Sequence, residues 1–216
     1  MIRDIQFNDF LYLLEGLRWT VVLSIVAFTG GTIGGVIIVL CRISPLRPVR
    51  YGAMLFIRLI QGTPLLIQLF LLFFGVLALG FEVDPWFAAT VGLSINAGAF
   101  LGEIWRGCIQ SVPHGQWEAS SALGLGYYSR MRYVVLPQAL RIAYAPTVGY
   151  AVQLIKATSV TSIVGFVEMT RAAQVINNVT FQPFLIFGTI SAFYFLLCWP
   201  LSLLSARLER RSTFRG

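Results

Sequence analysis

Charged side chains are scarce in this sequence. Asp, Glu, Lys and Arg make up 12% of its 216 residues, whereas hydrophobic residues make up 57%. The mean hydropathy of +0.77 is higher than a soluble domain can carry, because such a domain keeps a polar surface toward water. Composition therefore excludes an ordinary soluble protein and indicates one integral membrane domain over residues 1–216.

Acidic residues are the scarcer of the two charged classes. Nine Asp and Glu stand against 16 Lys and Arg, which gives a net charge of +7. Such an excess of cations can indicate a nucleic-acid binder. Here the arginines lie between long apolar stretches, which is typical of membrane proteins. We therefore expect a lipid bilayer and no nucleic acid as the partner of these cations.

Cysteine and histidine are few and scattered. Cys41, Cys108 and Cys198 show no C-x-x-C or Cys/His spacing, so we expect no metal site and no disulfide framework. The single histidine, His114, lies in a predicted turn without a recognisable nucleophile or orienting acid, and we expect no catalytic residues. An intramembrane protease or lipid transferase is the enzymatic alternative, although Glu103 is the only carboxylate in a predicted span.

Long apolar runs, by contrast, are abundant. Crossing the ~30 Å apolar layer of a membrane takes about 20 largely apolar residues. Five segments meet this requirement: residues 19–40, 53–77, 86–104, 143–163 and 184–204. Residues 1–15 are mixed in polarity, so we expect no cleavable signal peptide. Residues 165–183 predict a short helix at the membrane surface. The predicted fold class is all-α integral membrane, with about five transmembrane helices.

Positive charges are unevenly divided between the two sides that five spans define. One side has eleven arginines: Arg42, Arg47, Arg50, Arg106, Arg130, Arg132, Arg141, Arg207, Arg210, Arg211 and Arg215. The other side has three arginines and six acidic residues. Because cytoplasmic loops collect Lys and Arg, we predict that Met1 is extracytoplasmic and that His114 and Gly216 are cytoplasmic.

The first span contains four glycines, Gly30, Gly31, Gly34 and Gly35. Two overlapping small-x-x-x-small pairs let helix backbones approach closely in lipid. A glycine-rich phosphate loop is the alternative, but it needs a lysine and an aqueous opening. We therefore predict that these glycines pack against another helix.

Residues 112–142 form a polar, basic loop between spans three and four. Gly115–Leu123 has helical composition after Pro113, and Gly124 supplies a stop. Ser129 can cap a second short helix. Pro137 ends that helix and can lie in the first turn of the helix that leads to span four. The side chains expected to be exposed on the first helix are small: Ala119, Ser120, Ser121 and Ala122. The loop either docks another cytoplasmic protein or is a helical hairpin without a partner.

Part of this loop resembles a known motif. Glu118-Ala119-Ser120 is followed after three residues by Gly124 and after nine more by Val134-Val135-Leu136-Pro137. This order is similar to the EAA loop of ABC importer permeases (E-A-A, three residues, G, nine residues, I-x-L-P), with Ser120 and Val134 as mild departures. Other phrases resemble the polar amino-acid permeases of the histidine, glutamine and arginine type: GTPLLIQ at 62–68, EIWRG at 103–107, QSVPHGQWEA at 110–119, LPQA at 136–139 and TFQPF at 180–184.

The resemblance, which runs from about Phe10 to Arg211, implies a permease subunit of an ATP-driven importer of polar amino acids in the bacterial cytoplasmic membrane. It implies a second permease, identical or paralogous, two cytoplasmic ATP-binding subunits and an extracytoplasmic binding protein. The residues implied in coupling to the ATPase are Glu118, Ala119, Ser120, Gly124, Leu136 and Pro137. No G-x-x-x-x-G-K-[ST] motif occurs, so ATP and Mg are expected on the partner and no cofactor on this chain. A stand-alone channel or carrier is the alternative, against which the loop argues.

Polar residues inside the spans indicate a substrate route, because such groups are costly in lipid. Asn96 and Glu103 share one stripe of span three, and Gln153 and Lys156 share one stripe of span four. The full candidate set is Asn96, Gln153, Lys156, Glu103, Arg58 and Gln61. As alternatives, Glu103 pairs with Lys156 or with Arg106, and Arg58, expected one to two turns from the cytoplasmic end of its span, snorkels to the surface.

Two of these candidate positions differ from what family members often show. An acidic residue followed by arginine is common where this chain has Arg58 and Gln61, and Lys-Asp is common where it has Lys156-Ala157. The identity of the amino acid is therefore left open.

Overall fold

The computed structural model describes residues 3–213, and over these residues it is helical without any strand. The all-α membrane fold class is thereby confirmed. The helical elements are α1 (Phe7–Ile43), α2 (Arg47–Gly62), α3 (Leu65–Phe70), η1 (Leu71–Gly75), α4 (Val76–Ala78), α5 (Pro85–Gln110), α6 (His114–Ala122), α7 (Tyr127–Arg130), η2 (Met131–Val135), α8 (Leu136–Ala157), η3 (Thr158–Val164), α9 (Met169–Thr180) and α10 (Pro183–Thr213).

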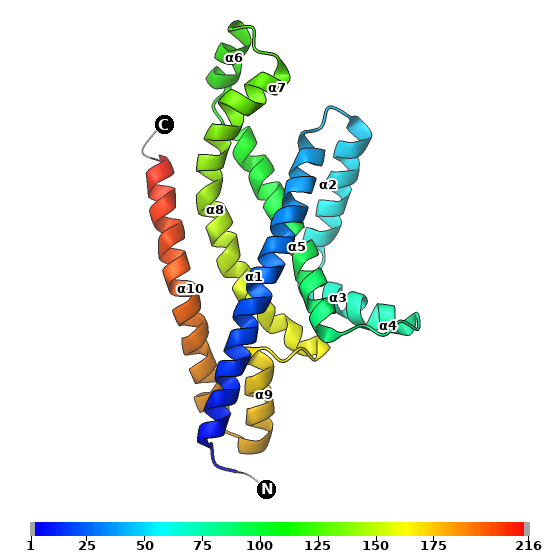
Figure 1. Cartoon of the computed structure of the whole chain (residues 1–216), viewed down its shortest axis with the longest axis vertical. Helices are drawn as coiled ribbons and strands as arrows, with labels where there is room; N and C mark the ends of the chain where they lie inside the picture. Colours follow the sequence, from blue (N-terminus) through cyan, green and yellow to red (C-terminus); the bar gives the residue numbers. More distant parts are fainter. Residues whose placement is uncertain (1–2, 214–216) are drawn as a thin grey trace.

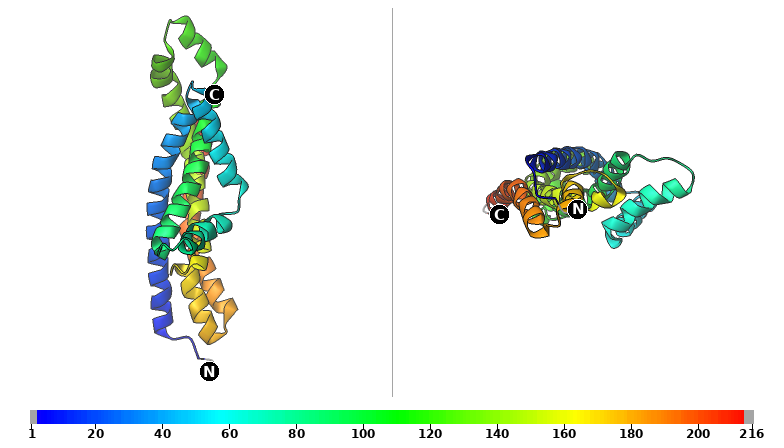
Figure 2. Two further views of the ribbon diagram at one scale, coloured as in Figure 1. Left: turned by 90° about the vertical axis from the view of Figure 1, so that its right-hand side faces the viewer. Right: turned by 90° about the horizontal axis from the view of Figure 1, so that it is seen from below.

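Three helices, α1, α5 and α10, are long and apolar enough to cross a membrane alone, and two bent helix pairs bring the number of crossings to as many as five. These helices run along the long axis of the molecule (Figure 1). The α6–α7 hairpin projects at one end, which it shares with the α1–α2 turn and the end of α10, whereas α9 and the start of α1 lie at the other (Figures 1 and 2). Which end faces the cytoplasm stays a prediction, and Met1, Arg215 and Gly216 lie outside the described residues.

The four glycines of the first span pack α1 against α5, as predicted. A Cβ added at Gly31 would lie 2.3 Å from the Cβ of Ala97, and one added at Gly98 would lie 3.4 Å from the backbone of Gly34. The glycines of α1 therefore leave room for the small residues of α5, which is the close approach that such residues permit in lipid.

The second span is not a single helix. The sequence predicts one transmembrane helix over residues 53–77, but α2 ends at Gly62 and the α3–α4 segment turns away from it by 103°. Pro64 lacks the N–H that would bond the carbonyl of Ile60 one turn earlier, and the residue before a proline favours extended backbone. Thr63 adopts that conformation, with φ −113° and ψ 141°, so the helix stops there.

The end of α6 has the backbone of a Schellman motif. Gly124 has a φ of +74°, and its N–H bonds the carbonyl of Ser121 at 2.9 Å while the N–H of Leu125 bonds that of Ser120 at 3.2 Å. Glycine adopts this left-handed conformation without steric cost. The stop predicted at Gly124 is confirmed.

Three details of the 112–142 loop differ from expectation. Ser129 does not cap the second short helix, because α7 begins at Tyr127 with Gly126 as its N-cap. Pro137 does not end that helix either, because the π-helical turn η2 carries the chain from α7 into α8. Pro137 does lie in the first turn of α8, as predicted. Ser120 is buried against η2 rather than exposed, with 3% of its surface accessible.

The predicted short helix at 165–183 is α9. Met169, Ala172 and Ile176 form its buried side, which packs with Leu13 of α1 and Ile186 of α10. The side chain of Glu168 caps the helix, accepting hydrogen bonds from the N–H groups of Thr170 and Arg171, both at 2.8 Å.

Candidate functional site

The break between α2 and α3 is held by the side chain of Gln68. Its Nε2 donates to the carbonyl of Ile60 at 2.6 Å and to the carbonyl of Thr63 at 3.0 Å. The Ile60 carbonyl is the one that Pro64 leaves without its helical donor. A side-chain amide therefore replaces the missing main-chain bond, which allows a sharp turn to exist at membrane depth.

The same glutamine continues into a polar chain across three helices. The Nδ2 of Asn96 on α5 donates to the Oε1 of Gln68 at 3.1 Å, and the hydroxyl of Tyr150 on α8 donates to the Oδ1 of Asn96 at 3.4 Å. The ring of Tyr150 stacks on Phe100, with centroids 5.6 Å apart. Asn96 is 9% exposed, so this predicted path residue lies just beneath the surface and not in a wide opening.

These polar groups lie on the side of α5 opposite α1. Gly98 meets α1, and Asn96, two residues earlier, projects about 160° away around the helix at 3.6 residues per turn. Figure 2, seen from below, shows α1 along one side of the bundle and the α2–α4 segment extending on the other. The amide and hydroxyl groups thus gather on the side that α1 leaves uncovered.

Arg58 and Gln61 are both exposed and belong to the last turn and a half of α2. The Nε2 of Gln61 approaches the carbonyl of Ala99 at 3.5 Å, which places it beside the polar chain. Arg58 lies about 16 Å along α2 from Arg47, taking ~1.5 Å per residue. Because α2 begins at Arg47 and not at residue 53, Arg58 lies about three turns from the start of its helix, and its depth in the membrane stays a prediction.

Gln153 and Lys156 are both exposed on α8. Gly149 faces α10, because a Cβ there would lie 3.4 Å from the Oγ of Ser205. Lys156, seven residues on, lies on nearly the same side of the helix. Gln153 lies between that side and the side of Tyr150, next to the uncovered region. Although Gln153 and Lys156 share one stripe of α8, Gln153 therefore lies closer to Asn96 than Lys156 does.

Glu103 does not pair with Lys156. Its carboxylate accepts hydrogen bonds from Arg106 at 2.6 and 2.9 Å, and the Nε of Arg42 on α1 lies 3.6 Å away. The predicted Glu103–Arg106 pair is confirmed. Arg42, which sequence reasoning did not connect with Glu103, joins α1 to α5 at the hairpin end of the molecule.

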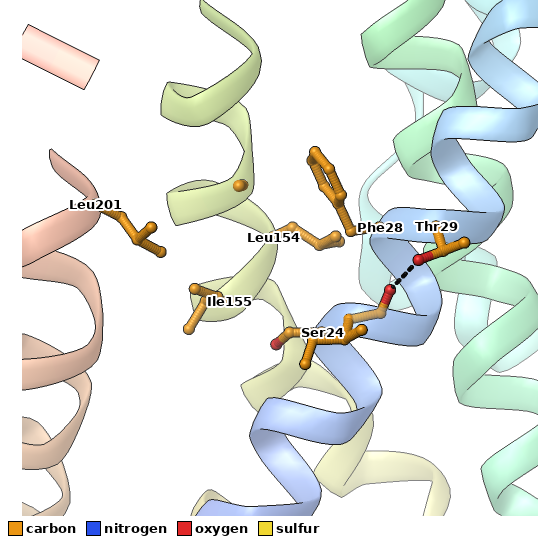
Figure 3. A pocket seen from close by; sticks show the side chains of 8 residues that line it. Ser24, Phe28, Thr29, Leu154, Ile155 and Leu201 are labelled. Carbon is orange, nitrogen blue, oxygen red and sulfur yellow. Dashed lines mark hydrogen bonds between the residues drawn. The ribbon is translucent and has the colours of Figure 1, made fainter. Parts of the chain in front are cut away.

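A cavity of about 220 Å³ lies on the other side of the bundle, where α1, α8 and α10 meet (Figure 3). Its lining is mostly apolar and includes Phe28, Leu154 and Leu201. The hydroxyls of Ser24 and Thr29 donate to carbonyls of their own helix at 2.7 and 2.8 Å. Such a lining suits a hydrocarbon group and gives no reason to place a polar substrate there.

The predicted coupling residues lie in the hairpin or just beyond it. Glu118, Ala119 and Gly124 are exposed, Ser120 is buried and Leu136 is half-buried, while Pro137 is exposed. The Nη1 of Arg130 donates to the Oγ of Ser121 at 2.5 Å, which ties α7 to α6. Beneath the hairpin, Val112, Met131 and Val135 form a small core with Val39 of α1, so the hairpin is anchored to the bundle.

Gln68 and Tyr150 were absent from the candidate set drawn from the sequence. Gln68 ends the GTPLLIQ phrase and follows the only proline of its span by four residues, which was a usable signal. Tyr150 lies 54 residues from Asn96, and helical periodicity gives the face of each residue without identifying the opposing helix.

Comparisons with known proteins agree along nearly the whole chain. The model of a family described as "Binding-protein-dependent transport system inner membrane component" matches residues 30–214. The L-cystine transport system permease protein TcyB of Bacillus subtilis is 38% identical over 91% of this chain and 84% of its own length. The glutamine transport system permease protein GlnP of Escherichia coli is 35% identical over 92% of each.

A solved structure shows the same fold. The chain matches one described as "Crystal structure of an amino acid ABC transporter with histidines" with a TM-score of 0.90 and 33% identity, covering 97% of this chain and all of the other.

Proposed function

We infer the cargo and partners of this chain from one premise: it belongs to the family of binding-protein-dependent transport system inner membrane components. The observation that carries the inference is that relatives at least 35% identical along more than nine-tenths of this chain are amino-acid permeases by name. We propose that this chain is the membrane-spanning subunit of an ATP-driven importer of polar amino acids in the bacterial cytoplasmic membrane.

The route for the amino acid lies on the side of the bundle that α1 leaves uncovered. Gln68, Asn96 and the Tyr150 hydroxyl form a polar chain there, and Gln61, Gln153 and Arg58 are exposed around it. Non-helical backbone at membrane depth is tolerated where protein or a water-filled cavity covers it. A second permease facing the α2–α3 break would provide the protein cover and enclose a water-filled cavity. Lys156 lies about two turns beyond Tyr150 on α8.

The energy for transport comes from separate subunits. Two ATPase subunits that hold ATP and Mg would each receive one α6–α7 hairpin, and an extracytoplasmic binding protein would deliver the amino acid. The small exposed side chains of Ala119, Ser121 and Ala122 let a groove approach α6 closely. The contacts of Met131 and Val135 beneath the hairpin transmit its movement to α8.

Reconstitution tests the cargo and the energy source together. The chain would be purified with its partner ATPase and placed in proteoliposomes with ATP and the matching binding protein. We expect uptake of at least one radiolabelled polar amino acid that requires both ATP and the binding protein. Uptake without the ATPase would indicate a stand-alone carrier, and absence of any amino-acid uptake by an assembled, ATP-hydrolysing complex would overturn the proposed function.

Gly124→Val tests the coupling role of the hairpin. Valine is strained at a φ of +74°, so the Schellman turn should not form and α6 should lose its orientation. We expect a folded permease that fails to bind or stimulate the ATPase, with transport lost. Gly126→Val is the matched control, because Gly126 has a φ of −64° that any residue adopts. Normal transport by Gly124→Val would show that the hairpin does not couple.

A further inference from the structure

Charged side chains within the five predicted spans are only three: Arg58, Glu103 and Lys156. The one acid among them, Glu103, is engaged by Arg106 and by Arg42, whose nitrogen atoms lie 2.6 to 3.6 Å from its oxygens. Arg58 and Lys156 have no ion-pair partner among the residues that the structure describes. Within the predicted spans, the two charges without an ion-pair partner are thus both positive. The buried Glu168 lies outside these spans and accepts hydrogen bonds from main-chain N–H groups and the Tyr194 hydroxyl.

The two cations lie on either side of the polar chain. The Ile60 carbonyl, Gln68, Asn96 and Tyr150 are joined by hydrogen bonds and so share one depth. Arg58 precedes Ile60 by about half a turn on α2, and Lys156 follows Tyr150 by nearly two turns on α8. Both helices run in the same direction from the hairpin end of the molecule (Figure 1), so one cation lies nearer each membrane surface.

Arg58 in particular occupies a position that needs a counter-charge. It shares the exposed side of α2 with Leu55 and Gly62 and lies about 100° around the helix from the buried Ile57. An uncompensated guanidinium at this depth is expensive in hydrocarbon, and snorkelling to the surface would have to span several turns. A carboxylate matches its planar fork with two parallel hydrogen bonds. An anionic group in the transport route would therefore bind here.

From this charge distribution we propose that the importer carries amino acids whose side chain has no positive charge, with Arg58 binding their carboxylate. The ammonium of the cargo finds neutral acceptors in the amide oxygens of Gln61 and Gln153. A cationic side chain would find no acid along the polar chain and would be repelled by Arg58 in a low dielectric. The proposal rests on the proposed function, since it divides the polar amino acids into accepted and rejected classes.

Uptake by the complete complex in proteoliposomes tests this proposal with labelled glutamine, glutamate, cystine, arginine and lysine. We expect uptake of at least one of the first three, and arginine and lysine to be taken up at least about tenfold more slowly, the discrimination expected from one unpaired charge. Uptake of arginine or lysine at the highest rate would overturn the charge class while leaving amino-acid import intact. Uptake of none of the five by a complex that hydrolyses ATP would instead count against amino-acid import itself.

Variants of Arg58 locate the effect. Arg58→Gln should lower uptake of the accepted amino acid by about ten- to a hundredfold, the loss of one charge-assisted pair. Arg58→Lys, which keeps the charge but not the fork, should retain more uptake than Arg58→Gln. Arg47→Gln at the start of the same helix is the control and should leave uptake unchanged. Assembly with the ATPase is measured for each variant, and an assembled Arg58→Gln complex with normal uptake would refute the role of Arg58.

Discussion

One side of α5 meets α1 through glycine and alanine, while its other side meets α2, α3 and α8 through amide and hydroxyl groups. The α1 side holds its partner mainly by close packing, since a Cβ at Gly31 would already lie 2.3 Å from its neighbour, with the Arg42–Glu103 ion pair added at the hairpin end. The opposite side is held by directional bonds, from Gln68 to Asn96 and from Tyr150 to Asn96. A single helix thus separates a rigid support from a polar surface suited to a water-soluble cargo.

The largest effect is expected on the α1 side. Gly31→Leu forces a side chain into the backbone of α5, and overpacking of this kind costs about 1–3 kcal/mol or more. We expect a large fall in the thermal unfolding temperature in detergent, together with loss of assembly. Gly188→Leu is the matched control, because nothing lies within 4 Å of a Cβ at Gly188. Equal stability of the two variants would show that the α1–α5 contact is not a tight one.

A smaller effect is expected on the polar side. Gln68→Leu leaves the Nδ2 of Asn96 without its partner, at about 1–3 kcal/mol, whereas the Ile60 carbonyl keeps the Thr63 hydroxyl as a donor at 3.4 Å. The unfolding temperature should fall and uptake should be lost. Gln153→Leu, at an exposed glutamine, serves as the stability control.

A double variant sharpens this second test. Gln68→Leu combined with Asn96→Leu should cost less than the sum of the two single changes, because both members of one bond are removed together. Additive losses would mean that the Gln68–Asn96 bond contributes nothing in the folded protein.

The smallest effect on stability is expected at the contact between α1 and α9, where the carboxyl group of Glu168 is buried. Glu168 is fully buried beside the α1–α9 contact, and burial raises its pKa above the ordinary value of 4.5. Between the unfolded pKa of about 4.5 and the raised folded pKa, such a carboxyl group binds more protons in the folded than in the unfolded state. Stability should therefore decrease as the pH rises from about 4.5 through the folded pKa. The variant Glu168→Gln should lose this pH dependence in thermal unfolding; a wild-type curve that rises over the same pH range would contradict the assignment.

Sequence periodicity found those features that depend on one segment at a time. The apolar runs gave the helices, the spacing of Gly30 to Gly35 gave the packing side of α1, and Gly124 gave the end of α6. The features that periodicity did not find depend on contacts between two segments of the chain. The 103° turn requires Gln68 to reach back to Ile60, and the continuous α7–α8 run requires a π-helical turn before Pro137.

The candidate site shows the same division. The stripe on α5 grouped Asn96 with Glu103 but could not show that Asn96 meets Gln68 and Tyr150. The stripe on α8 likewise could not show that Lys156 turns toward α10. Glu103 likewise has one partner that periodicity predicts, Arg106 at i+3, and one on another helix, Arg42, that it cannot. The close packing of glycine and alanine fixes the orientation of each helix about its own axis, and this orientation decides which residues of two helices come into contact.

The length of α2 bears on how far a solute must travel without water. Its 16 residues measure about 24 Å at ~1.5 Å per residue, less than the ~30 Å thickness of the apolar layer. Beyond Gly62 the α3–α4 segment runs across the long axis (Figure 1), so it adds little to that height. Taken alone, α2 is therefore too short to cross the apolar layer, and the rest of that depth would have to be lined by other parts of the protein or by a partner.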